Sequence, residues 1–216
     1  MKCKDFTITE VKPKIFHFNF KDQYKMAMHF LRYQEYYESP NPKFRNKPFE
    51  IFDFMEWYSK EYGNGAFTYA TDWEGFNFPA DILKKLYNGC LIPDLNNYDY
   101  TMCEAYNECR EKCGDDKLYI IGSVGSGEVM KHEIAHGFFY LNKTYKKEMT
   151  KLVKALKPSL LKQIYKRFKD IGYTEKVYVD ECQAYLSTGA PFLEDVYMTG
   201  DEETPFIELY EKYYTK

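Results

Sequence analysis

Residues 117–142 read KLYIIGSVGSGEVMKHEIAHGFFYLN, and the structural prediction begins from this stretch. The β-branched and aromatic residues of KLYIIGSV predict a β-strand over 117–124, and the glycines that follow end it. A helix is then predicted from about 128 to 142, because Ile134 and Phe138 place apolar side chains on one face at helical spacing. The chain therefore passes from a strand through a tight glycine turn into a helix that can be buried on one side.

The rest of the chain predicts a mainly helical protein. Residues among the first twenty positions indicate one or two strands around Lys12 and Pro13. Residues 63–79 are aromatic and rich in turn-forming residues, which favours a packed loop or a short pair of strands. Apolar spacing, prolines and glycines predict a turn at 189–191 and helices at 22–38, 48–63, 81–88, 96–112, 177–186 and 205–214, with two more within 146–169 divided at Pro158. The predicted class is α+β, mainly helical with a small mixed β-sheet.

Charge and hydropathy argue against two classes of partner. The formal net charge is −3, so the chain lacks the basic excess that binding to nucleic-acid phosphates requires. No apolar run approaches the roughly 20 residues that cross a bilayer, and the first residues, MKCKDFTITE, lack the apolar stretch of a secretion signal. We therefore expect no nucleic-acid or membrane partner and a cytoplasmic, reducing compartment in which the six cysteines need no disulfide framework. The oligomeric state is not predicted.

Within the predicted helix, His132-Glu133-Ile134-Ala135-His136 has the pattern H-E-x-x-H. At 100° per residue the two histidines lie about 40° apart, so both imidazoles can bind one Zn²⁺ ion. Glu133 lies about 60° from His136, where its carboxylate can take a proton from water at the metal. The alternative is that both histidines are ordinary surface or capping residues. The position of the motif, after a strand and a glycine turn, favours the metal site.

A catalytic zinc site needs a third protein ligand and an open position. No histidine follows His136, so the third ligand is expected to be a carboxylate, unless His17 or His29 folds back from the N-terminal region. Glu181 is the best candidate, because its segment VDECQAYL combines helical spacing, small neighbours and apolar flanks. Asp180 is the second candidate. The competing interpretation for both acids is a stabilising charge in the first turn of a helix.

The motif His132-Glu133-x-x-His136 with a later helical glutamate resembles the gluzincins, zincin-like metallopeptidases whose third zinc ligand is a glutamate. The long interval to Glu181, which opens a Glu-x-x-Ala pattern, looks most like the catalytic domain of anthrax lethal factor and related toxin peptidases. The resemblance covers about 117–214 and implies a zincin-like fold, Zn²⁺ as cofactor and a peptide or protein as substrate. It implies His132, His136 and Glu181 as zinc ligands and Glu133 as general base.

One position departs from this family. Many gluzincins place an aspartate four residues after the ligand glutamate to orient a zinc histidine, and here that position is Tyr185, so the orienting residue is not assigned. Tyr173, Tyr178 and Tyr185 lie near the third ligand in sequence, and we take Tyr178 as the catalytic tyrosine that donates to the oxyanion. Core or surface packing is the competing role for each tyrosine. The implied reaction is peptide-bond hydrolysis by a metal-activated water, with Glu133 as general base.

A second resemblance extends over most of the chain. FLRYQEYYESPNPKFRNKPF, TDWEGFNFP, KHEIAHGFFY and DECQAYLSTG are similar to uncharacterised proteins of bacteriophages and large viruses, which implies a place in the host cytoplasm or the virion. With 216 residues, 44% of them hydrophobic and 19% aromatic, the chain has enough apolar side chains for its own core. We expect one zincin-like domain over 1–216, in which 117–216 carries the zinc site and 1–116 covers it.

Other features give weaker signals. The glycine-rich residues 122–128 lack the Lys-Ser/Thr of a phosphate loop, so a tight turn is favoured. Cys103, Cys109 and Cys113 contain no C-x-x-C pair, which favours free thiols over a second metal site. The acidic and aromatic residues 72–77 can line a cleft, but a packed loop is favoured.

An alternative remains for the function of the chain, and another for the role of the strand at 117–124. The chain can be a non-catalytic zincin-like binding or interaction protein, whose metal site is structural or lost. The strand at 117–124 can bind a peptide by edge pairing, or it can be a buried central strand.

Overall fold

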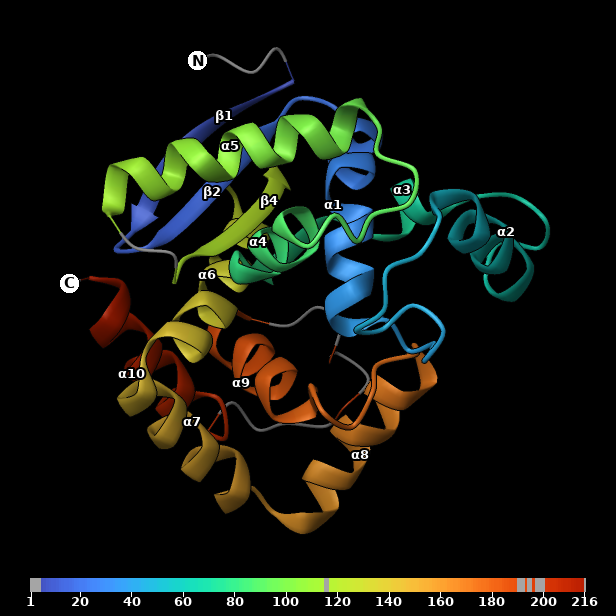
Figure 1. The fold of residues 1–216 in the computed structure, drawn as a ribbon. Helices are drawn as coiled ribbons and strands as arrows, with labels where there is room; N and C mark the ends of the chain where they lie inside the picture. The colour runs from blue at the N-terminus through green and yellow to red at the C-terminus, as the bar shows by residue number, and fades with distance from the viewer. Residues whose placement is uncertain (1–4, 115–116, 190–192, 194–195, 197–200, 216) are drawn as a thin grey trace. The chain divides into compact units, whose positions relative to one another are not determined.

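The sheet of this protein contains four strands in the order β1-β2-β4-β3. The labels β1, β2 and β4 mark three of these strands in Figure 1. The computed structural model describes residues 5–114, 117–189, 193, 196 and 201–215. Contacts group the chain into an N-terminal unit, Met1–Met130, and a C-terminal unit, Lys131–Lys216. The predicted α+β class, mainly helical with a small mixed sheet, is confirmed. The single zincin-like domain over 1–216 stays a prediction.

The N-terminal unit contains the sheet. Its strands are β1 (Phe6–Lys12), β2 (Ile15–Phe20), β3 (Gly75–Pro79) and β4 (Tyr119–Val124). β1 pairs with β2 and β3 pairs with β4 in antiparallel orientation, whereas β2 and β4 are parallel. Because β4 has a hydrogen-bonded neighbour on each side, the expectation that residues 117–124 offer a free edge to a peptide is wrong. The alternative, a buried central strand, is confirmed.

Apart from the short helix α3, the helices of the N-terminal unit begin and end close to the predicted positions. They are α1 (Gln23–Glu38), α2 (Ile51–Glu61), α3 (Tyr69–Asp72), α4 (Asp81–Asn88) and α5 (Asn97–Cys113). Asp22 caps α1 by accepting a hydrogen bond from the backbone N–H three residues later. Asn96 and Asp99 form a capping box at the start of α5, and Gly114 ends this helix with a φ of 65°. Residues 63–79 contain the short helix α3 and the strand β3 rather than a loop or a strand pair.

A close contact between α1 and the sheet organises the core of the N-terminal unit. The ring of Phe30 on α1 is fully buried among four phenylalanine rings of β2 and β3, at centroid distances of 5.5 to 6.3 Å. Gly122 of β4 faces the same ring, and a Cβ atom added to it would lie 2.5 Å from a ring carbon. The strand therefore needs glycine here because the helix side chain approaches its backbone.

We expect Gly122→Ala to destabilise the protein by about 1–3 kcal/mol, because the added methyl group overpacks a core that has no room to shift. Gly127→Ala is the matched control, since a Cβ atom at Gly127 meets no atom within 4 Å. Urea unfolding of both variants measures the difference. Equal free energies of unfolding for the two variants would contradict the close approach of Phe30 to β4.

A buried carboxylate on α1 makes stability depend on pH. Glu35 is 8% exposed, and its Oε1 accepts a hydrogen bond from the Tyr69 hydroxyl at 2.9 Å. Burial raises the pKa of Glu35 from 4.5 to about 7, although hydrogen bonds from Ser39 and Tyr69 act in the opposite direction. The native state therefore binds a proton at this group more tightly than the unfolded chain does.

The stabilisation linked to this proton is complete below about pH 4.5, declines as the pH rises and is lost above about pH 7. Glu35→Gln keeps an acceptor for Tyr69 but does not ionise. The stability of this variant relative to wild type should therefore rise by about 3 kcal/mol between pH 4.5 and pH 8. Urea unfolding across this range tests the prediction, and parallel pH profiles of the two proteins would refute it.

The described part of the C-terminal unit is helical. Its helices are α6 (Glu128–Leu141), which begins in the N-terminal unit, α7 (Lys143–Ala155), α8 (Pro158–Asp170), α9 (Tyr178–Thr188) and α10 (Thr204–Tyr214). Asn142 separates α6 from α7 and caps α7 with its side chain. Pro158 is the first residue of α8, where its missing N–H leaves no helical hydrogen bond unmade, so the basic region divides as predicted. α9 packs against α7, α8 and α10 and is therefore central in this unit.

Two further expectations concern membrane-spanning helices and the turn at 189–191. None of the helices in the described ranges is both long and apolar enough to span a membrane. Of the turn expected at 189–191, Ala190 and Pro191 lie outside the described residues.

Candidate metal centre

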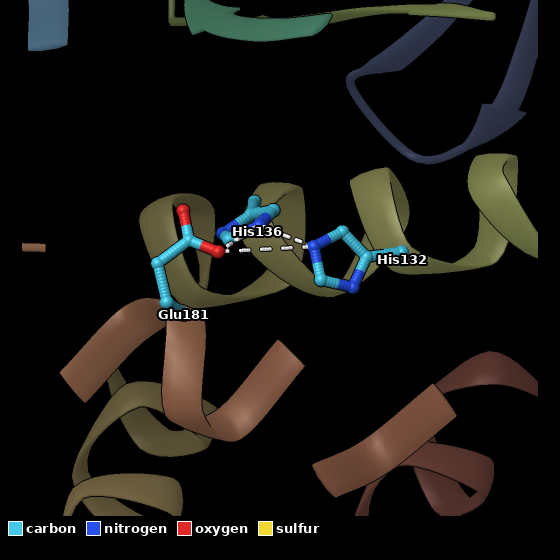
Figure 2. A group of neighbouring side chains, drawn as sticks. All are labelled: His132, His136 and Glu181. Carbon is cyan, nitrogen blue, oxygen red and sulfur yellow. Dashed lines mark hydrogen bonds and ion pairs between the residues drawn. The ribbon is translucent and has the colours of Figure 1, made fainter. Parts of the chain in front are cut away.

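Two helices of the C-terminal unit supply the side chains of the candidate site (Figure 2). His132 and His136 lie one turn apart on α6, and Glu181 lies in the first turn of α9. Ile134 and Phe138 bury the same stretch of α6, as the apolar spacing predicts. In Figure 2 both imidazoles of α6 face the carboxylate of α9. The structure therefore brings together the three residues that the sequence analysis selects as ligands.

The facing atoms form a small triangle. The Nε2 atoms of His132 and His136 are 3.2 Å apart, and Oε2 of Glu181 lies 3.9 Å from the first and 3.8 Å from the second. The point in their plane that is equidistant from all three atoms lies about 2.1 Å from each, which matches zinc–nitrogen and zinc–oxygen bonds of about 2.0–2.2 Å. One metal ion can therefore contact all three side chains.

The carboxylate of Glu181 is buried without a partner for one of its oxygens. The residue is 3% exposed, and its Oε2 atom has no hydrogen-bond partner among the described residues. Burial raises the pKa of Glu181 to about 8; the charge of His136 lowers this pKa, whereas the charges of Asp180 and Glu133 raise it further. A buried carboxylate oxygen that faces two imidazole nitrogens is what a cation site requires, because a cation compensates the cost of burying the charge.

Asp180 contacts the opposite side of the His136 ring. Its Oδ1 atom accepts a hydrogen bond from Nδ1 of His136 at 2.9 Å. The carboxylate holds the ring in this orientation with a proton on Nδ1, so a metal that displaces the proton of Nε2 can bind the lone pair of that atom. Asp180 thus orients a histidine, the role that the sequence analysis leaves unassigned, and is not needed as the alternative third ligand. Burial lowers the pKa of His136, but the charges of Asp180, Glu181 and Glu133 outweigh burial and raise this pKa well above its usual value.

Glu133 lies on α6 beside both histidines and is 5% exposed. Its charge contributes to the raised pKa values of His136 and Glu181. Burial and the charge of His136 lower the pKa of His132 well below its usual value, which keeps the His132 ring neutral and its lone pair available. Glu133 is therefore a candidate general base next to a candidate metal.

Two tyrosines adjoin the candidate ligands. Tyr173, in the segment between α8 and α9, lies near Glu181 and Tyr185 and lowers the pKa values of both side chains. The ring of Tyr185 packs against that of His132, with centroids 4.5 Å apart. Tyr185, at the position that holds an aspartate in many gluzincins, therefore supports His132 by ring packing.

Tyr178 has a different environment. Its ring packs against those of Tyr165 and Phe168, at centroid distances of 5.0 and 5.7 Å, and it is 7% exposed. The described contacts of Tyr178 belong to an aromatic cluster and not to the candidate ligands, so its role as the catalytic tyrosine stays a prediction. Distance along the sequence does not separate it from Tyr173, because both precede Glu181 by only a few residues.

The alternative ligands have other environments. In the N-terminal unit, Nε2 of His17 lies 2.8 Å from Oγ of Ser123, and Nδ1 of His29 lies 2.7 Å from the carbonyl oxygen of Lys25. Within the described ranges, the group of side chains placed to hold a metal is the pair of histidines with Glu181. The three cysteines of α5 are free thiols outside this group.

Comparisons with protein-family models, with curated proteins and with solved structures found no match to this chain. The interpretation of the site is therefore built on the geometry and chemistry of its own residues.

We expect the purified protein, after exposure to Zn²⁺ and dialysis, to retain one zinc ion per chain. His132→Ala and Glu181→Ala each remove a ligand atom and should abolish retention, whereas Glu175→Ala, an exposed acid in the same region, should not change it. Metal content measured by mass spectrometry, with the zinc-induced rise in melting temperature as a second readout, tests the site. Retention of zinc by both ligand variants would rule it out.

Proposed function

We propose that this chain is a zinc-dependent metallopeptidase of gluzincin type, with a zincin-like fold. One observation carries the proposal: two imidazole nitrogens of α6 converge on a buried carboxylate oxygen of α9 that has no hydrogen-bond partner among the described residues. His132, His136 and Glu181 are the proposed ligands.

The donor set favours zinc. Two imidazoles and one carboxylate are a common ligand set of catalytic zinc, whereas calcium and magnesium favour oxygen ligands. Three protein ligands leave a position open for water or substrate. When bound, Zn²⁺ supplies Lewis acidity, which polarises a carbonyl group and lowers the pKa of water.

Glu133 is the proposed general base. It follows His132 directly on α6, and its charge raises the pKa values of His136 and Glu181. It accepts the proton of the water that attacks the scissile carbonyl and delivers this proton to the leaving amine as the C–N bond breaks. Because the residue is 5% exposed, bulk water has little access to the carboxylate during this transfer.

Tyr173 replaces Tyr178 as the proposed donor to the oxyanion. Its hydroxyl adjoins Glu181, and a phenolic O–H can donate a hydrogen bond to the oxygen on which negative charge develops. The Tyr173 ring packs against Phe168, with centroids 5.7 Å apart, and Tyr185, whose pKa Tyr173 lowers, packs against His132.

The proposed substrate is a peptide or protein, as the H-E-x-x-H motif with a third glutamate ligand implies. The alternative is a zincin-like binding protein that holds a metal but cleaves nothing. Zinc retention is common to both proposals, so a cleavage assay has to distinguish them.

We expect zinc-loaded wild type to cleave members of a peptide library, and Glu133→Gln to keep zinc but lose about 10²–10⁴-fold in kcat, since an amide cannot accept the proton. Tyr173→Phe should keep zinc and lose about 10²-fold in kcat. Mass spectrometry of the products measures both losses.

Tyr178→Phe is the matched control, because it removes a hydroxyl from the same region of the chain and should leave kcat near that of wild type. A Glu133→Gln variant as active as wild type would disprove the role of Glu133. If wild type retains zinc and cleaves no peptide of the library, the binding-protein alternative replaces the peptidase.

A further inference from the structure

A chain of hydrogen bonds extends from His136 into the interior of the C-terminal unit. Oδ1 of Asp180 accepts a hydrogen bond from Nδ1 of His136 at 2.9 Å and a second one from Nε2 of Gln183 at 3.0 Å. Oε1 of Gln183 in turn accepts a hydrogen bond from the Tyr145 hydroxyl at 2.9 Å. Three helices, α6, α9 and α7, are thus linked through consecutive side chains.

The two residues farthest from His136 in this series of hydrogen bonds are more deeply buried than Asp180. Gln183 and Tyr145 are both 0% exposed, whereas the side chain of Asp180 is 18% exposed. A buried amide needs partners for both of its ends, and here one end binds Tyr145 while the other binds Asp180. The reversed amide would place Oε1 of Gln183 against the carboxylate, where two acceptors repel each other. The network therefore determines the orientation of the amide.

Gln183 acts on the same carboxylate oxygen that contacts His136. Asp180 and Gln183 are three residues apart on α9, so their side chains lie on one helix face. The amide holds Oδ1 toward the imidazole, although the partly exposed carboxylate could otherwise rotate toward water. Tyr145 is restrained in turn by the rings of Phe138 and Tyr213, at centroid distances of 5.6 and 5.0 Å.

We propose that Gln183 and Tyr145 are positioning residues for the metal site, which act through Asp180 to hold His136 with its proton on Nδ1 and its Nε2 toward the metal. The inference rests on the proposed zinc site. It extends that site from the proposed ligands to the hydrogen-bonded side chains of Asp180, Gln183 and Tyr145, which we call the relay.

The test compares zinc affinity across a graded series, measured by competition with a chromophoric chelator. Asp180→Ala should weaken zinc binding about 10–100-fold, as loss of a carboxylate partner of a metal histidine does. Gln183→Met removes the amide at similar volume and should weaken binding about 10-fold. Tyr145→Phe removes only the hydroxyl at the end of the relay farthest from His136. It should weaken zinc binding less than Gln183→Met does.

Matched controls separate the relay from general destabilisation. Tyr165→Phe removes a tyrosine hydroxyl from α8, and Gln163→Met removes an amide from the same helix, and both should bind zinc as wild type does. Circular dichroism and thermal unfolding identify any variant that fails to fold, and Tyr145→Phe, which changes one atom, keeps the test valid if Gln183→Met is unfolded.

A spectroscopic readout reports the relay directly. In zinc-loaded protein labelled with ¹⁵N-histidine, the Nδ1–H proton of His136 should exchange slowly with water in wild type and faster in Gln183→Met and Tyr145→Phe. A merely structural role would lower the melting temperature without changing this exchange.

The outcomes distinguish the relay from the site itself. Wild type that binds no zinc overturns both proposals. If Asp180→Ala weakens zinc binding while Gln183→Met and Tyr145→Phe match their controls in affinity and exchange, the site stands and the relay is refuted. The graded loss of affinity with faster Nδ1–H exchange supports the relay.

Discussion

Two imidazoles of α6 and a buried carboxylate of α9 face one another, and the other features of the site depend on this contact. Oε2 of Glu181 lies 3.8 Å from Nε2 of His136, beyond hydrogen-bond distance, and has no hydrogen-bond partner among the described residues. Burying a carboxylate is costly unless a cation or hydrogen bonds compensate its charge. The surrounding helices hold this arrangement in place: Tyr210 of α10 donates a hydrogen bond at 3.0 Å to the carbonyl oxygen of Lys131, the residue before His132.

The proposed ligand set is predictable from sequence because it follows from helical periodicity and from composition. His132 and His136 must share a helix face wherever that helix packs, and Glu133 must lie beside them. Because no histidine follows His136, the third ligand is expected to be a carboxylate. The small, apolar neighbours of Glu181 mark it as the acid that can be buried. The helix boundaries are predictable for a similar reason, since residues such as Pro158 act through local backbone chemistry.

The partners of the ligands are not predictable in this way, because they depend on how packed elements are rotated. Asp180 and Glu181 are adjacent and project about 100° apart, so only the packing of α9 decides which of them reaches which nitrogen of His136. The choice between Tyr173 and Tyr178 depends on the path of the segment before α9. For residues 63–79 the sequence left a packed loop and a strand pair open, because the five residues of β3 acquire extended structure by pairing with the distant strand β4.

The central claim is that His132, His136 and Glu181 bind one zinc ion in this chain. X-ray absorption at the zinc edge of the loaded protein measures the type, number and distance of the ligand atoms. The account predicts two imidazole nitrogens and one carboxylate oxygen at about 2.0–2.2 Å, with a further light atom in the open position. A zinc environment with sulfur ligands, or with one imidazole or none, would contradict it.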